Sequence, residues 1–159
     1  LNCSISATTR PVRGSEGHGK DYHFLTIEEF NRKIEGGEFI EWEEVYTGRY
    51  YGTLKSELQR IWNAGGTVVF DVDVKGGVNI KKLLGNKALA IFVMPPSVKE
   101  LRKRLESRKT DSEEDIEARV RLAKKEMSYS KYFDKIIVNN KLDDAIAEAE
   151  QLVEDWLIE

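Results

Sequence analysis

The densest group of side chains able to bind an anion lies near the start of the sequence, where Arg10 and Arg13 follow a run of serines and threonines. A guanidinium group binds phosphate through two parallel hydrogen bonds, and hydroxyl groups donate to the remaining oxygens. Tyr22 and Tyr51 offer two further hydroxyl donors. Two arginines three residues apart are more often solvated loop charges, so the pair favours a phosphate site only together with these neighbours.

A second candidate group stands at the end of an apolar run over residues 68–70, which Asp71 and Asp73 follow. Ligands of open α/β sheets bind outside the carboxyl ends of the strands, so acids at this point suit Mg²⁺ or the edge of a base. An aspartate also often simply ends a strand. The pattern leaves both interpretations open.

Three arginines fall in a stretch that is expected to be helix–turn–helix, residues 95–127: Arg104, Arg108 and Arg119. Arg104 and Arg108 are four residues apart and therefore share one helix face. Arginines on a helical lid suit phosphoryl transfer, because negative charge spreads over the transferred group. A salt-bridged surface helix is the alternative for any one of them.

One apparent motif is rejected. Residues 14–20 have the GxxxxGK spacing of a P-loop, but Asp21 stands where that motif needs a serine or threonine for Mg²⁺. The segment is also expected to join a polar turn to a strand, whereas a P-loop joins a strand to a helix.

Strands and helices are expected to alternate around these residues. Continuous apolar runs at 67–70, 88–93 and 136–138 predict strands buried on both faces of a parallel sheet. Apolar residues at helical spacing predict helices between them and a closing helix over 142–156. The first 55 residues instead suggest a small mixed sheet. The expected fold class is α/β with right-handed crossovers.

Composition narrows the function further. The 159 residues fit one domain, with 25 basic and 28 acidic side chains and a net charge of −3. That acidity disfavours a nucleic-acid binder, and no apolar run is long enough to span a membrane. One cysteine and two histidines exclude a disulfide framework and disfavour a zinc site or a multi-histidine metal site, and the lone cysteine agrees with the cytoplasm.

Several segments together resemble guanylate kinase, of the bacterial type, in order and spacing: Ser6–Arg13, Gly19–Tyr22, Glu38–Trp42, Tyr50–Thr53, Phe70–Asp73, Pro95–Ser97 and Ile137–Asn139. The resemblance runs from Ser4 to the end of the chain. It implies one domain over 1–159, with a P-loop nucleoside-monophosphate-kinase-like parallel sheet and flanking helices. Within it, the resemblance places a mixed-sheet GMP-binding lobe at about 4–55, a core at about 56–96 and 128–159, and a helical lid at about 97–127.

The resemblance also implies roles for individual residues. The GMP phosphate would be bound by Arg10, Arg13, Tyr22 and Tyr51, and the guanine by Ser6, Glu41 and Thr53. Asp71 and Asp73 would face the base and the Mg–nucleotide, Asp73 on the GMP side and Asp71 among the catalytic groups. Arg104, Arg108 and Arg119 would be the catalytic lid arginines, Arg104 and Arg108 binding ATP together with Asn139 near the adenine. Mg²⁺ would arrive with ATP, without a dedicated protein site.

Elementary chemistry agrees with the role of Glu41. Guanine offers an N1–H and an exocyclic amine to one carboxylate, whereas adenine presents an acceptor at N1. Hydrogen bonds to charged groups contribute about 1.5–3 kcal/mol each, so a carboxylate that adenine leaves unpaired discriminates strongly between the two bases.

The family's P-loop, which lies upstream of the cluster at Ser6, is missing from this sequence, and the first residues read like the inside of a strand. We therefore expect a parent protein that transfers the terminal phosphoryl group of ATP to GMP in purine nucleotide metabolism, and poor catalysis by the 159 residues alone. The alternative is a non-catalytic guanylate-kinase-like module that holds a phosphorylated peptide in the GMP lobe.

Overall fold

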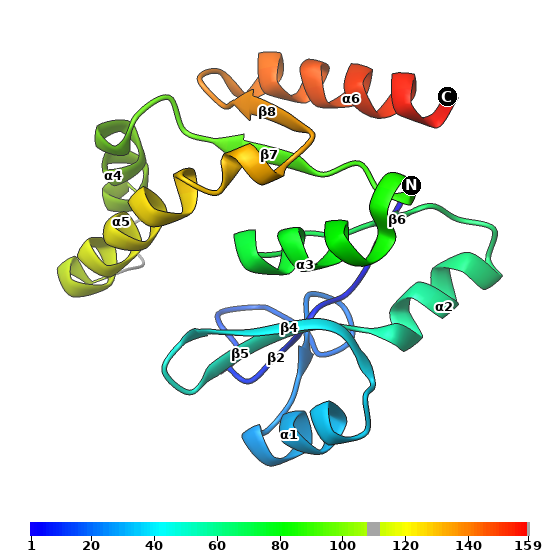
Figure 1. Cartoon of the computed structure of the whole chain (residues 1–159). Coiled ribbons are helices and arrows are strands. Elements are labelled where there is room, and N and C mark those ends of the chain that lie inside the picture. The colour runs from blue at the N-terminus through cyan, green and yellow to red at the C-terminus, as the bar shows by residue number, and fades with distance from the viewer. Residues whose placement is uncertain (108–111, 159) are drawn as a thin grey trace. The chain divides into compact units, whose positions relative to one another are not determined.

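The computed structural model describes residues 1–107 and 112–158. The chain divides into two compact units, Leu1–Leu83 and Leu84–Glu159 (Figure 1). This division differs from the partition into lobe, core and lid, which stays a prediction. None of the helices in the described part of the chain has the length and apolar character to cross a membrane.

A four-stranded mixed sheet forms the centre of the first unit. Its order is β3-β2-β5-β4, with β2 parallel to β3 and antiparallel to β5, and with β4 and β5 paired as an antiparallel hairpin. The mixed sheet expected from the first 55 residues is thus confirmed. The strands are β2 (Ala7–Thr8), β3 (His23–Phe24), β4 (Phe39–Tyr46) and β5 (Arg49–Leu54).

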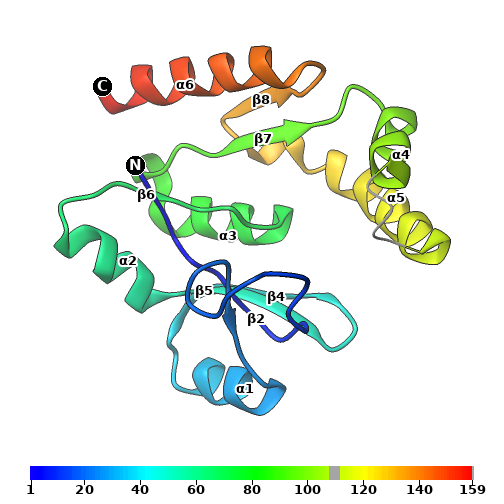
Figure 2. The same ribbon diagram turned by 180° about the vertical axis from the view of Figure 1, so that it is seen from behind.

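Helix α1 (Ile27–Glu35) packs against this sheet, as both views show (Figures 1 and 2). It begins with a capping box in which Thr26 and Glu29 satisfy each other's backbone N–H groups. Phe30 is fully buried and stacks on Phe39 of β4, with 4.4 Å between the ring centroids. This contact fixes the start of β4, the strand that carries Glu41.

The rest of the first unit follows a strand–helix order. The short β1 (Asn2–Cys3) pairs in parallel with β6 (Val68–Val69), and α2 (Lys55–Asn63) and α3 (Val74–Leu84) lie on either side of β6 in the sequence. Glu57 of α2 is buried, accepts hydrogen bonds from the Ile5 N–H and from Arg60, and contacts His23. Glu57 therefore ties α2 to the chain segments that enter the mixed sheet.

The second unit is built on one parallel strand pair. β7 (Ile91–Met94) pairs with β8 (Lys135–Val138), and α4 (Val98–Ser107) and α5 (Glu113–Met127) lie between these strands in the sequence. Leu105, Ile116 and Val120 join the two helices in a small core. The chain continues from β8 into α6 (Leu142–Ile158), and single 3₁₀ turns occupy Gly85–Lys87 and Ser130–Tyr132.

The strands of the second unit differ from the sequence prediction in their burial. Phe92 and Ile137 are buried, whereas Val93, Ile136 and Val138 are about half exposed. The prediction of strands buried on both faces was wrong here. Successive side chains of a strand point to opposite faces. In each of the two strands, one side chain is buried, and the side chains next to it in the sequence, which face the other way, are partly exposed.

Gly52 of β5 provides a test of packing in the mixed sheet. A Cβ at this position would lie 2.8 Å from the Glu41 carbonyl oxygen and 2.9 Å from Cδ1 of Phe39. We expect Gly52→Ala to lower the free energy of unfolding by about 1–3 kcal/mol, because overpacking forces the hairpin apart. Urea unfolding of the purified chain measures this change.

Gly17→Ala is the matched control, since the nearest atom to its added Cβ would be 3.7 Å away, an ordinary contact. Equal losses of stability in both variants would contradict the packing argument.

Candidate functional site

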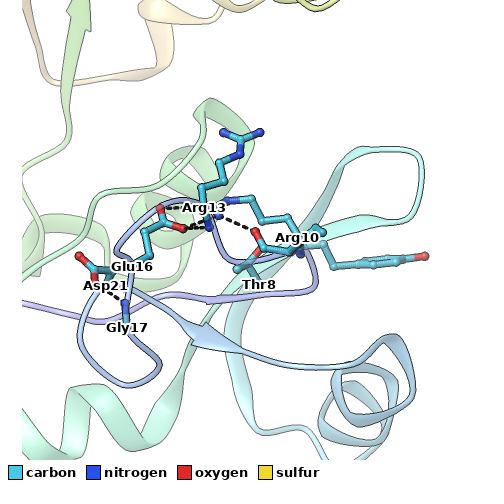
Figure 3. A network of polar contacts seen from close by, with 8 residues as sticks. Thr8, Arg10, Arg13, Glu16, Gly17 and Asp21 are labelled. Atoms are coloured by element: carbon cyan, nitrogen blue, oxygen red, sulfur yellow. Dashed lines mark hydrogen bonds and ion pairs between the residues drawn. The ribbon is translucent and has the colours of Figure 1, made fainter. Parts of the chain in front are cut away.

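Arg10, which follows β2, is held on several sides. Its Nη1 and Nη2 donate to Oε2 and Oε1 of Glu16 at 2.7 and 2.6 Å, and Nη1 also donates to the Pro11 carbonyl oxygen at 2.9 Å (Figure 3). The guanidinium carbon lies 4.7 Å from the centroid of the Tyr22 ring and 5.6 Å from that of Phe24. Only 6% of the Arg10 side chain is exposed. Arg10 is therefore a preorganised cation.

Glu16 was not among the residues that the sequence singled out. Besides Arg10, its carboxylate accepts the backbone N–H of Arg13 at 2.9 Å (Figure 3). The bonds from Arg10 and from Arg13 lower the pKa of Glu16 to about 2, and the same ion pair raises the pKa of Arg10. The only sequence signal for this role is an acid three residues after Arg13 in a glycine-rich turn.

The other predicted phosphate ligands gather around Arg10. The Tyr22 and Tyr51 rings are 6.3 Å apart, and both side chains interact with the Arg10 guanidinium. The Arg13 side chain is exposed, and its guanidinium points away from the Glu16 carboxylate (Figure 3). The bonds from Arg10 to Glu16 and Pro11 do not use its Nε–H. Arg10 and the two tyrosines thus form one polar cluster.

Glu41 and Thr53 face each other across the β4–β5 hairpin. The Thr53 hydroxyl donates to Oε1 of Glu41 at 2.8 Å, and the two residues are 0% and 7% exposed respectively. Burial raises the pKa of Glu41 to about 7, with repulsion from Asp73 and Glu43 adding to the effect and the Thr53 bond opposing it. Among residues 1–107 and 112–158, the groups that act on this carboxylate are Thr53 and the two acids Asp73 and Glu43, so it can accept donors from a ligand.

The two acids that follow β6 differ in their surroundings. Asp73 Oδ1 accepts the Gly76 N–H at 2.8 Å in the first turn of α3, and its charge acts on Glu41. Asp71 is exposed. Ser6 precedes β2, where its carbonyl oxygen accepts the His23 N–H at 2.9 Å. Of the predicted base-facing residues, the structure therefore places Thr53 and Asp73 next to Glu41.

The second unit brings together Arg104 and Asn139. Arg104 of α4 donates from Nη1 to the Asn139 carbonyl oxygen at 3.0 Å and from Nη2 to that of Asn140 at 3.3 Å. Its Nε donates to Glu100 at 3.2 Å. Arg119 is half-buried on α5, and Arg108 lies outside the described residues. Arg104 thus ties α4 to the chain just after β8.

The donor set for a metal ion is sparse. Among residues 1–107 and 112–158, the structure has no group of three or more His, Cys, Asp and Glu side chains that could hold a metal ion. The exposed Asp71 carboxylate has the oxygen chemistry that Mg²⁺ prefers. It fits a metal that is held mainly by a nucleotide's phosphates.

Comparison with known proteins gives a consistent result. The guanylate kinase family model matches residues 1–156. A guanylate kinase of Bacteroides thetaiotaomicron is 53% identical over 157 residues, which cover 99% of this chain and 77% of that protein. One of Porphyromonas gingivalis is 53% identical over 152 residues, 96% of this chain and 79% of that protein. The crystal structure of guanylate kinase from Anaplasma phagocytophilum matches with a TM-score of 0.80 at 32% identity, over 97% of this chain and 74% of that one.

The raised pKa of Glu41 generates a prediction about stability. Between the ordinary value of 4.5 and about 7, the folded chain keeps a proton that the unfolded chain has lost. The free energy of unfolding therefore falls as pH rises through this window, by roughly 3 kcal/mol. Glu41→Gln removes this titration, so the variant should gain stability over the wild type between pH 5 and pH 8.

Urea unfolding of both proteins at the two pH values measures the difference. Other titrating groups are shared and cancel in the comparison. A stability difference that stays the same at pH 5 and pH 8 would show that Glu41 is not held at a raised pKa.

Proposed function

Because the chain belongs to the guanylate kinase family, we propose that its parent protein transfers the terminal phosphoryl group of ATP to GMP, giving ADP and GDP. The observation that carries this proposal is the buried Glu41 carboxylate, held by Thr53 in the same unit as the preorganised Arg10. One is suited to a guanine base and the other to a phosphate.

Guanine recognition follows from the state of Glu41. The carboxylate accepts the N1–H and the exocyclic amine of guanine, and these donors favour its ionised form. Adenine offers no N1–H, so AMP would leave the buried carboxylate without that partner. Ser6 and Asp73 complete the proposed guanine contacts. Selectivity for GMP over AMP is the consequence.

Phosphate recognition rests on Arg10. Glu16 fixes its guanidinium through Nη1 and Nη2, and we assign the edge that contains Nε to the GMP phosphate. Tyr22 and Tyr51 lie near that guanidinium and donate from their hydroxyls, and Arg13 adds a second cation from the exposed turn. Glu16 is in this account a positioning residue, because it acts through Arg10.

We assign the contacts with the phosphates and the adenine of ATP to four residues of the second unit. Arg104, Arg108 and Arg119 neutralise the charge of the transferred phosphoryl group, and Arg104 and Arg108 bind ATP together with Asn139. When bound, Mg²⁺ supplies charge neutralisation on the phosphates of ATP, and Asp71 is the residue that would hold it or its water ligands. The transfer itself is in-line and needs no covalent intermediate, since the protein's residues act by positioning and by charge.

A phosphorylated peptide would satisfy Arg10 but would leave the buried Glu41 without a partner, so no observation favours the interaction-module alternative. We place the reaction in purine nucleotide metabolism in the cytoplasm. The reducing cytoplasm suits a chain with a single cysteine, Cys3.

The test compares acceptors and a variant in the intact protein. With ATP and Mg²⁺, we expect ADP to form with GMP and not with AMP. Glu41→Ala should raise the KM for GMP by about tenfold or more, because two charge-assisted hydrogen bonds are lost. A coupled assay of ADP release measures the kinetics, and a circular-dichroism melt checks that the variant is folded.

Glu44→Ala is the control, since Glu44 is an exposed acid of the same strand. Its KM for GMP should match the wild type. Unchanged GMP kinetics in a folded Glu41→Ala protein would refute the assignment of Glu41 to guanine.

A further inference from the structure

A glycine in the first turn of α3 lies directly against the Glu41 carboxylate. Gly76 is buried, and a Cβ added to it would lie 2.6 Å from Oε2 and 3.2 Å from Cδ of Glu41. Real Cβ atoms do not approach other heavy atoms so closely. With Gly76 replaced by any other residue, the Glu41 carboxylate could not keep its present place.

The local backbone gives no other reason for a glycine. Gly76 is helical, and it is not among the glycines with positive φ in the described chain. Glycine also weakens a helix relative to alanine. A glycine that costs helix stability without serving a turn is explained by close packing, and Glu41 supplies the contact.

Each oxygen of the Glu41 carboxylate therefore has a neighbour that restricts its position. On one side, the Thr53 hydroxyl donates to Oε1 at 2.8 Å. On the other, Gly76 lies against Oε2, and its position is fixed by its own N–H bond to Asp73 Oδ1 at 2.8 Å. The Gly77 N–H adds a bond to the Asp73 carbonyl oxygen at 2.9 Å. Asp73 thus anchors the helical turn that borders the carboxylate.

We propose that Gly76 is a specificity-determining position for the acceptor base, because its lack of a side chain lets Glu41 keep both carboxylate oxygens in line with two guanine donors. This inference rests on the proposed function, in which Glu41 accepts the N1–H and the exocyclic amine. A side chain at position 76 rotates the carboxylate so that it still accepts the N1–H but no longer accepts the exocyclic amine.

The test uses GMP and IMP, whose base keeps the N1–H but lacks the exocyclic amine. Calorimetric titration of the wild-type protein should show tighter binding of GMP. In Gly76→Ala, GMP should bind about tenfold more weakly, while IMP binding changes far less, so the preference collapses. A general structural defect would instead weaken the binding of both nucleotides alike.

Asn79→Ala is the control. Asn79 is an exposed residue of α3 that contacts Glu43, and its replacement by alanine raises helix propensity, as Gly76→Ala does. It should keep the preference for GMP over IMP. A folded Gly76→Ala protein with the wild-type preference overturns the inference and leaves the proposed function standing. A wild-type protein that does not bind GMP overturns both.

A double-mutant cycle covers the case in which Gly76→Ala does not fold. The same substitution is made in a Glu41→Ala background, where the clashing carboxylate is gone. If Gly76→Ala destabilises the wild type but not the Glu41→Ala protein in urea unfolding, the contact is confirmed. If Gly76→Ala lowers the free energy of unfolding equally in both backgrounds, the loss does not come from contact with Glu41, and the inference fails.

Discussion

The buried carboxylate of Glu41 constrains the part of the first unit that surrounds it. Glu41 sits in the middle of a hairpin, with Thr53 opposite and the first turn of α3 beside it. Burying a carboxylate is costly, and the chain compensates only in part, through the side chain and the backbone of Thr53, while Asp73 and Glu43 add repulsion. The cost appears as a pKa raised to about 7. Such a group gains most from a ligand that brings its own N–H donors.

Arg10, the second buried charge of the proposed site, differs from Glu41 because an oppositely charged side chain pairs with it. Arg10 is as buried as Glu41, but Glu16 compensates its charge fully with two short hydrogen bonds. The ion pair with Glu16 holds the Arg10 guanidinium in place. The Glu41 carboxylate has too few hydrogen-bond donors around it and can accept more from a ligand. The same unit thus holds a cation that is fixed by an ion pair and a carboxylate that is short of hydrogen-bond donors, and both support the proposed binding of a nucleoside monophosphate.

Much of this site could be predicted from residue types and spacing. Arg10, Tyr22 and Tyr51 cluster as expected, and the mixed sheet that carries Glu41 and Thr53 forms within the first 55 residues, where it was expected. The prediction of the sheet succeeds because the residue patterns that favour strands are local. The comparisons confirm the resemblance to guanylate kinase, and the roles that it implies for these residues stay predictions.

The features that sequence could not predict all depend on tertiary contacts. In the sequence, nothing distinguishes Glu16 from the other acids or Gly76 from other helical glycines. Their roles depend on the contacts of Glu16 with Arg10 and of Gly76 with Glu41 in the folded chain. Arg104 likewise binds two carbonyl groups that lie 35 and 36 residues away in the sequence. The partial burial of β7 and β8 depends on which elements pack on each face of the pair, which an apolar run does not encode.

Calorimetric titration of the 159-residue chain with GMP and with AMP near pH 7, in two buffers of different ionisation enthalpy, tests whether Glu41 binds guanine. We expect that GMP binds, that AMP does not, and that GMP binding releases protons, because guanine's donors favour the ionised Glu41 carboxylate. Equal binding of both nucleotides by the folded chain, or GMP binding without proton release, would refute this role of Glu41.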